Sequence, residues 1–532
     1  MYDFSKGLYV AHCDCGALSI CGKMANRHGL IAGATGTGKT VSLQVIAETF
    51  CQAGVPCFMA DMKGDLSGIS QTGSMTGFIQ KRCAEFGIDN PQFAGCPTRF
   101  FDVYGEQGHP MHTTISNMGP QLLARLMQLN DVQEGVLNVL FRVADERGLL
   151  LIDLKDLRSM LTYVADNAAD ISRQYGAVSA VSVSAIQRAL LALENEGAEK
   201  FFGEPSFDIF DLMQCEGGKG VMSVLAADKL MLNPKLYSTF MLWLLSDLYA
   251  QLPEVGDLDL PKLVFFFDEA HTLFDGTSKA LTDKIEQVIR LIRSKGVGIY
   301  FVTQNPTDIP DEILGQLGNR VQHALRAYTP KDQKAVRAAA QTFRANPEFD
   351  TEEAIMQLET GEALVSFLDE KGAPSVVQRA RILFPLSQIG AISEGQRTQI
   401  VNASRLYGRY DHPIDRESAF EVLLAESEKI ASEAQARQEE ETVAKERKAT
   451  GKAEKSGTKT GGNKLVKTIA TAAVGAAISS VSRSVGTSVS NKITGKKSKT
   501  TSAKSVAGRA ASSAASSVVR NLTRSILGNL LK

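Results

Sequence analysis

Gly33-Ala34-Thr35-Gly36-Thr37-Gly38-Lys39-Thr40 is the stretch that decides the fold. It fits G-x-x-x-x-G-K-[ST], in which glycines let the backbone turn tightly and aim several N–H groups at one triphosphate. The pattern predicts that Lys39 reaches the β- and γ-phosphates and that the Thr40 hydroxyl ligates Mg²⁺. The apolar run 29–32 and the helical period of 41–51 predict the strand and helix that such a loop needs. All eight residues are therefore predicted to bind ATP or GTP.

A second strand is predicted at 56–60, so that strand, helix and strand form a βαβ unit of a parallel sheet. The polar run 61–65 follows at the edge where open α/β sheets bind ligands. For Asp61 and Asp65 two interpretations stay open. They contact the water shell of the metal, or they cap the next helix.

A third predicted strand, 262–267, has five consecutive apolar residues and ends in Asp268-Glu269. Behind a P-loop, this is the Walker B pattern. It predicts that Asp268 holds Mg²⁺, directly or through water, and that Glu269 polarises the attacking water as general base. The alternative is an ordinary core strand that ends in a helix cap.

Two more polar positions follow. The buried strand predicted at 298–303 ends at Gln304, which is placed to sense the γ-phosphate or orient water, unless it is an amide that only fixes a loop. Arg290 and Arg293 lie three apart on one helical face before that strand. An arginine at this place is a candidate trans finger for a neighbouring subunit, and the alternative is a solvated basic helix end.

The predicted organisation has six parts. They are a lead-in at 1–27, the P-loop half of the ATPase core at 28–96, a largely helical insertion at 97–250, the Walker B half with a closing β-hairpin at 251–385, a charged helical extension at 386–449 and a basic Ser/Ala-rich tail at 450–532.

Charge is divided unevenly along the chain. The formal net charge is −1, yet 463–532 holds 12 Lys/Arg and no Asp/Glu, so residues 1–462 carry −13. A basic tail predicts contact with an anionic membrane or nucleic acid, and a self-docking or disordered tail is the alternative.

Cellular location follows from what the sequence lacks. No signal peptide opens the chain and no stretch of about 18 apolar residues occurs, which predicts a cytoplasmic protein. Eight cysteines then fit reduced thiols. His12, Cys13, Cys15 and Cys21 leave zinc binding open, although their spacing favours plain thiols.

The chain resembles the HerA-like helicase family within the HerA/FtsK class of P-loop ATPases, and most closely its bacterial YjgR branch. Beyond the two nucleotide motifs, the resemblance rests on NRHGLI (26–31), DMKGDL (61–66), GEQGHP (105–110), LWLL (242–245), FFFDEAH (265–271), the run 290–306 and GQLGNR (315–320). It covers about 5–425. It implies a RecA-like core, with a mostly parallel sheet flanked by helices. Its relatives form hexameric rings that hydrolyse ATP with Mg²⁺ at subunit interfaces and act on double-stranded DNA.

The resemblance also assigns residues by motif. Lys39, Thr40, Asp268 and Glu269 match the catalytic set; Gln304 matches the position after the fourth strand, Arg293 the trans arginine, and Arg27 a basic residue ahead of the P-loop strand. Arg27 precedes its own phosphates by about five strand residues, or about 17 Å, so any role is in trans or structural. Archaeal relatives carry a β-barrel before the ATPase that helps to dock a nuclease. Here fewer than 30 residues precede the P-loop strand, so no nuclease partner is predicted.

Two functions remain in view. The first is an oligomeric ATPase motor acting on double-stranded DNA. The second is a nucleotide-dependent switch or remodelling ATPase acting on protein or at the membrane, with the basic tail as its anchor.

Overall fold

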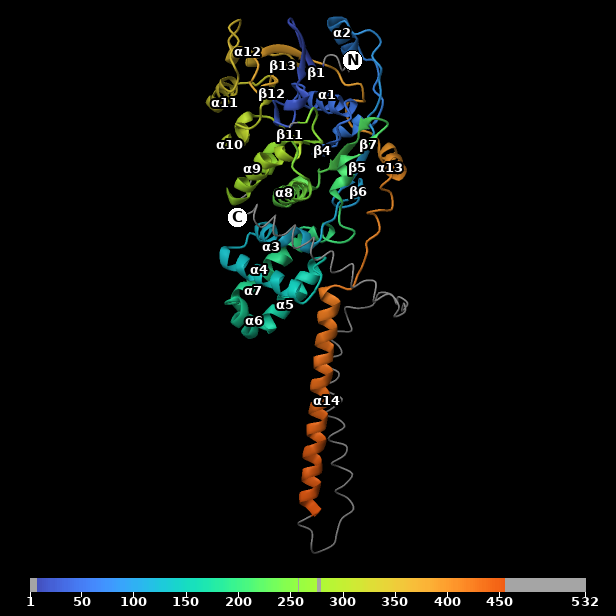
Figure 1. Cartoon of the computed structure of the whole chain (residues 1–532), viewed down its shortest axis with the longest axis vertical. Helices are drawn as coiled ribbons and strands as arrows, with labels where there is room; N and C mark the ends of the chain where they lie inside the picture. Colours follow the sequence, from blue (N-terminus) through green and yellow to red (C-terminus); the bar gives the residue numbers. More distant parts are fainter. Residues whose placement is uncertain (1–6, 257, 275–278, 455–532) are drawn as a thin grey trace. The chain divides into compact units, whose positions relative to one another are not determined.

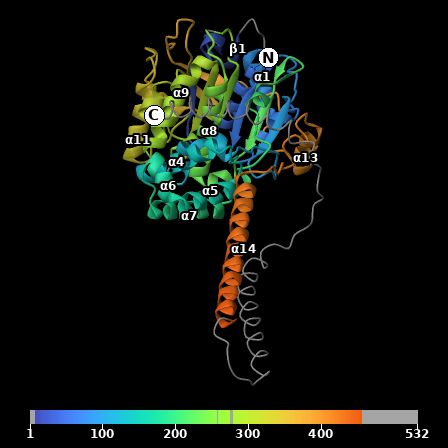
Figure 2. The same ribbon diagram turned by 60° about the horizontal axis from the view of Figure 1, so that its bottom comes forward.

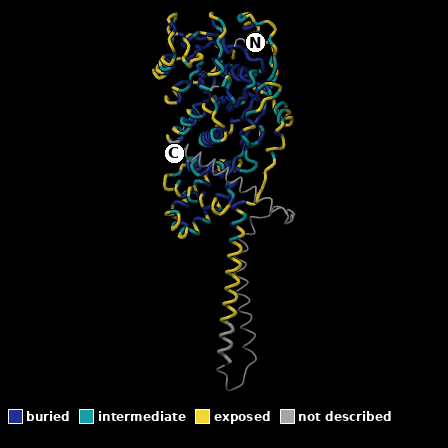
Figure 3. The backbone as a smooth tube through the Cα atoms, in the orientation of Figure 1, coloured by how far each residue is buried: buried dark blue, intermediate teal, exposed yellow. Residues whose placement is uncertain are grey.

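A computed structural model of the chain describes residues 7–256, 258–274 and 279–454 (Figure 1). Two compact units divide within helix α14 (Ala419–Glu454). One contains the chain up to Leu423, and the described part of the other is the remainder of α14. Residues 427–445 of this helix are all exposed (Figure 3). A long helix therefore lies within the predicted charged extension, but it begins at Ala419, and the predicted basic tail lies outside the described residues from 455 onward.

A twelve-stranded sheet forms the centre of the first unit, in the order β2-β1-β14-β13-β12-β3-β11-β10-β4-β9-β5-β6. The strands from β12 to β6 are parallel, and β13, β14, β1 and β2 pair antiparallel. The bounds are β1 Leu8–Cys13, β2 Gly16–Ile20, β3 Gly29–Ala32, β4 Cys57–Asp61, β5 Thr98–Asp102, β6 His109–Pro110, β9 Met222–Ala226, β10 Leu263–Phe267, β11 Val297–Thr303, β12 Asn319–Gln322, β13 Glu362–Ser366 and β14 Gln378–Ile382.

The predicted α/β architecture is confirmed: the chain has a mostly parallel sheet flanked by helices, with the P-loop between β3 and the helix that begins at Lys39. The predicted strands before the P-loop, before Asp268 and before Gln304 are β3, β10 and β11, and the predicted closing hairpin is β13–β14. Every residue of β10 is buried, as its apolar run requires for a strand covered on both faces. Because β11 lies between β3 and β10, the three ends that carry site residues are adjacent.

The lead-in at 1–27 is not separate from the core, because β1 and β2 form a hairpin that joins the sheet through β14. At its turn, Cys13 and Cys15 form a disulfide, so the expectation of reduced thiols is wrong for this pair. Cys21 is free. Within the described residues, no group of three or more His, Cys, Asp or Glu side chains could hold a metal ion.

The range 97–250 is only partly a helical insertion, because it also supplies β5, β6 and β9 to the sheet. The helices between residues 115 and 195 form a group on one side of the first unit (Figures 1 and 2). The core likewise continues past 385, since Arg397 of α13 lies 4.5 Å from the ring centroid of Phe100 on β5. Helix bounds are α1 Lys39–Gln52, α2 Gly77–Phe86, α3 Ile115–Leu126, α4 Asp131–Glu146, α5 Leu154–Asp166, α6 Ala168–Tyr175, α7 Ala180–Asn195, α8 Pro234–Gln251, α9 Lys279–Ile292, α10 Asp311–Leu314, α11 Pro330–Gln341, α12 Thr351–Gln357 and α13 Glu394–Ala403.

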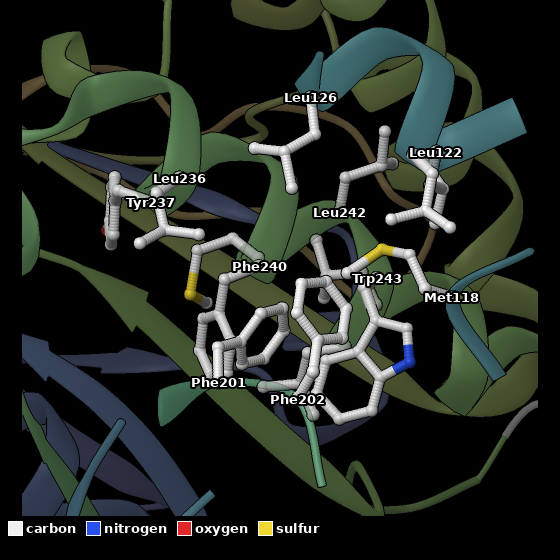
Figure 4. Close-up of a cluster of buried hydrophobic side chains, with 14 of the residues drawn as sticks. Met118, Leu122, Leu126, Phe201, Phe202, Leu236, Tyr237, Phe240, Leu242 and Trp243 are labelled. Atoms are coloured by element: carbon white, nitrogen blue, oxygen red, sulfur yellow. The ribbon is translucent and has the colours of Figure 1, made fainter. Parts of the chain in front are cut away.

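One continuous core joins the helical group to the sheet. Figure 4 shows where they meet: Met118 of α3 lies beside Trp243 of α8, and Leu122 of α3 lies near Leu242 of α8. Trp243 is 1% exposed, and its ring centroid lies 5.8 Å from that of Phe240. No single helix of the described residues is long and apolar enough to cross a bilayer. Helices α6 and α7 reach that length and apolar composition only when taken together, and the chain bends by 103° between them.

Candidate nucleotide site

The P-loop connects β3 to α1 and is held from both sides. Gly33 N–H donates to the carbonyl of Thr303 at 3.2 Å, and Ala34 N–H donates to that of Ala324 at 2.8 Å. Gly33 also admits no side chain, because a Cβ there would lie 2.5 Å from the Cβ of His323. Gly36 and Gly38 adopt φ values of 78° and 110°, which favour glycine. The loop therefore has the turn that the motif predicts.

His323 packs against the P-loop as a neutral imidazole. Its Nδ1 lies 2.8 Å from the Glu362 carbonyl and must donate, so its Nε2, 2.7 Å from Ser42 Oγ, accepts. Complete burial, opposed by the Glu362 hydrogen bond and assisted by the Lys39 charge, lowers its pKa to about 4. His323 was not foreseen from the sequence, where no motif marks it.

Lys39 is the first residue of α1 and lies across the loop. Its Nζ donates to the Ala34 carbonyl at 3.1 Å, and the residue is 8% exposed. Burial lowers the pKa of Lys39, with Glu269 and Asp268 opposing the change and Lys63 adding to it. A buried ammonium held against the loop backbone offers positive charge where phosphates are expected to bind.

Asp268 follows β10 with one carboxylate oxygen unused. Its Oδ2 is buried and has no hydrogen-bond partner within the described structure. Burial and the neighbouring Glu269 charge raise its pKa to about 6. Buried carboxylate oxygens normally have partners, so this open oxygen fits a Mg²⁺ ligand. Thr40, half-buried at the start of α1, is the second ligand by motif.

Glu269 is the most constrained residue of the site. It adopts φ 45°, a conformation that non-glycine residues rarely take outside functional positions. Lys63 forms an ion pair with its Oε1, and Gln304 Nε2 donates to its Oε2 at 3.3 Å. Burial would raise the pKa of Glu269, but the Lys63 and Gln304 hydrogen bonds and nearby positive charge lower it overall. The carboxylate is therefore held ionised.

Asp61 caps a backbone loop. Its carboxylate accepts from the N–H groups of Lys63, Gly64 and Leu66 at 3.3, 2.8 and 3.2 Å. Burial and the Asp65 charge raise its pKa to about 7. For Asp61 the structure shows the capping interpretation, and the capped loop places Lys63 against Glu269. Asp65 makes no side-chain cap hydrogen bond, and its Oδ1 is buried without a partner among the described residues, so both interpretations stay open for Asp65. The sequence signal for Lys63 was only its position after a strand next to β10.

Arg27 and Arg293 lie at the amino ends of the parallel strands, opposite the ends that carry the nucleotide site. Arg27 precedes β3 and Arg293 precedes β11, whereas the P-loop and Gln304 follow those strands. The two segments adjoin there, since Asn26 Nδ2 donates to the Arg293 carbonyl at 3.4 Å. The Arg293 side chain is exposed and no ion pair joins it to another described residue, whereas Arg290 pairs with Glu286. Neither Arg27 nor Arg293 belongs to the nucleotide site of its own chain.

The predicted site residues therefore fall into two groups. Lys39, Asp268, Glu269 and Gln304 come together around the loop of residues 33–40, at the carboxyl edge of the sheet. Arg27 and Arg293 are placed at the other edge, about 23 Å away along the seven residues of β11.

Comparisons with known proteins agree with this core. The family described as "Helicase HerA-like C-terminal" matches residues 10–498. The DNA double-strand break repair helicase HerA of Sulfurisphaera tokodaii is 34% identical over 109 residues, which are 20% of this chain and 21% of that protein. Its namesake from Sulfolobus acidocaldarius is 31% identical over 99 residues, 18% of this chain and 19% of that protein. The match thus spans about a fifth of each relative.

Among solved structures, the plasmid coupling protein TrwB with a GTP analogue is 14% identical, with a TM-score of 0.48, covering 70% of this chain and 89% of that one. VirB4 of Thermoanaerobacter pseudethanolicus is 13% identical, with a TM-score of 0.43, covering 71% and 96%. The family model matches most of this chain, and the P-loop follows β3 while the Asp-Glu pair follows β10 in the same mostly parallel sheet. The chain therefore belongs to the HerA-like helicase family.

Proposed function

We propose that the chain is an ATP-hydrolysing motor that works as a homo-oligomer, as a hexameric ring, on double-stranded DNA. The observation that carries the hydrolytic part is the pair at the end of β10. Asp268 offers an unpartnered buried oxygen, and Glu269 is held ionised beside it. A site that only bound the Mg²⁺ complex of a nucleotide would use Asp268 but would not need the ionised Glu269.

Each residue then has a stated task. Loop N–H groups and Lys39 bind the phosphates, while Thr40 and Asp268 hold Mg²⁺, which supplies charge neutralisation at the phosphate oxygens when bound. Glu269 accepts a proton from the attacking water, and Gln304 orients its carboxylate. The hydrogen bonds from Lys63 and Gln304 favour the ionised form that a base requires.

Oligomeric action follows from the two arginines. An exposed Arg293 at the far edge of the sheet cannot reach its own phosphates, but it is free to complete a neighbour's site. Arg27 shares this edge and has the same restriction. The ring and its interfacial sites are therefore part of the proposal.

Duplex DNA in the cytoplasm is the proposed setting, supported by the relatives' title of DNA double-strand break repair helicase. The alternative, a switch or remodeller acting on protein or at a membrane, has its own observation: residues 1–462 carry a net charge of −13. An acidic surface does not attract a polyanion.

The test is ATP hydrolysis at low salt with and without duplex DNA, beside a mass measurement of the assembly. The motor predicts stimulation by DNA that falls as salt rises, from an assembly larger than a monomer. Lys39→Ala is the matched control and should show neither basal nor stimulated turnover. Robust hydrolysis that no form of DNA changes would favour the alternative.

A further inference from the structure

A partly exposed phenylalanine lies beside the P-loop, on the side away from β10. Phe78, on α2, is 44% exposed. Gly361, the residue before β13, donates its N–H to the Thr37 carbonyl at 3.0 Å. A Cβ on Gly361 would lie 4.0 Å from Phe78 Cζ, and a Cβ on Gly38 would lie 3.5 Å from Gly361 Cα. Only one residue therefore separates the Phe78 ring from the P-loop.

A buried arginine fixes this arrangement. The Arg82 side chain is 7% exposed, and its Cζ lies 5.3 Å from the ring centroid of Phe78. Its Nη2 donates to the Gly361 carbonyl at 3.3 Å, and its Nη1 pairs with Glu85 at 3.1 Å. One guanidinium thus contacts both the ring and the segment bonded to the loop. The ring is held in place while a large part of it remains open to solvent.

The geometry of the site says which part of a nucleotide would meet this ring. Asp268, Glu269 and Gln304 follow β10 and β11, so the γ-phosphate end belongs on that side of the P-loop. Phe78 and Gly361 lie on the opposite side, because the strand order runs β13-β12-β3-β11-β10. A triphosphate bound along the loop therefore directs its nucleoside end toward Phe78.

We propose that Phe78 is the stacking platform for the nucleobase of bound ATP and that Arg82 is a positioning residue for it. The inference rests on the proposed function, since it requires a nucleoside triphosphate in the P-loop. An aromatic ring that stacks on a base strengthens binding in other complexes, whatever the base. Loss of the ring should then weaken ATP binding roughly tenfold, without affecting the phosphate contacts.

The experiment compares ATP with inorganic tripolyphosphate, both with Mg²⁺, as ligands for the full chain. Phe78→Ala should raise the Kd for ATP roughly tenfold and leave that for tripolyphosphate unchanged, and Phe78→Trp should restore tight ATP binding. Phe210→Ala is the matched control, because Phe210 is also 44% exposed but lies on the short helix Ile209–Met213. It should leave both affinities as they are.

Any one of the following results would overturn the platform. ATP affinity unchanged in Phe78→Ala is one, and equal weakening of ATP and tripolyphosphate is another, because it would indicate damage to the loop itself. The third is a smaller assembly with normal ATP binding, which would make Phe78 a subunit contact. Failure of the proposed function looks different: the wild-type chain would bind neither ligand. If wild type binds both equally tightly, the P-loop stands and the platform falls.

Discussion

Acidification should destabilise the protein through His323, the neutral imidazole beneath the P-loop. Burial lowers its pKa to about 4 in the folded chain, whereas an unfolded histidine titrates near 6.5. The folded state therefore resists protonation, so the contribution of His323 is complete above pH 6.5 and is lost as the pH falls toward 4. Linkage between these two values gives a loss of roughly 2 kcal/mol between pH 7 and pH 5.

The assay is urea unfolding at both pH values, followed by the fluorescence of Trp243, the chain's single tryptophan. Other groups titrate in this range, so the quantity to compare is the acid-induced loss in wild type and in His323→Asn. The variant keeps a donor for the Glu362 carbonyl but cannot gain a proton. We expect its acid-induced loss to be smaller by roughly 2 kcal/mol. His412→Asn, at an exposed position, should behave as wild type. Equal losses in His323→Asn and wild type would refute the reasoning.

Three further predictions concern the site. Glu269→Gln should lower turnover by at least about 100-fold while ATP still binds, as single-turnover assays would report; near-normal turnover would mean that another group is the base. Arg293→Ala alone should lose about 1,000-fold in turnover, and mixing it with Lys39→Ala subunits should recover part of the activity. Full activity of Arg293→Ala by itself would contradict a trans role. Gly33→Ala should weaken ATP binding about tenfold in calorimetry, because its methyl has no room, whereas Gly395→Ala has open space and should not; equal affinities would show that the loop adapts.

The centre of the site was predictable because its signals are local. Lys39 lies in a contiguous motif, and Asp268 ends an apolar strand that only a buried position explains. In a parallel sheet, such strand ends meet at one edge, so their proximity follows from strand assignment alone. No long-range information was needed to place them together.

What the sequence did not reveal depends on strand order. β9 lies between β4 and β5, yet its Met-Ser-Val-Leu-Ala segment is too short and too weakly patterned to stand out within a helical region. The contact between Lys63 and Glu269 exists because β4 pairs with β10. The β1–β2 hairpin is recognisable as part of the sheet only once β14 is known to receive it. Such pairings are set by packing between distant segments, which no local pattern records.

β11 has a feature of consequence for an assembly. Its seven residues begin at Val297, four residues after Arg293, and end just before Gln304. Its last carbonyl accepts a hydrogen bond from the N–H of Gly33 in the P-loop. Because β11 is hydrogen-bonded to β10 on one side and to β3 on the other, it resists bending and stretching, and we expect its two ends to move together. In a ring of subunits placed head to tail, β11 of each subunit would connect its own nucleotide site to that of its neighbour. A displacement of Arg293 against a neighbour's phosphate would then displace Gln304 directly through β11. This coupling is the simplest way for consecutive subunits to hydrolyse ATP in sequence.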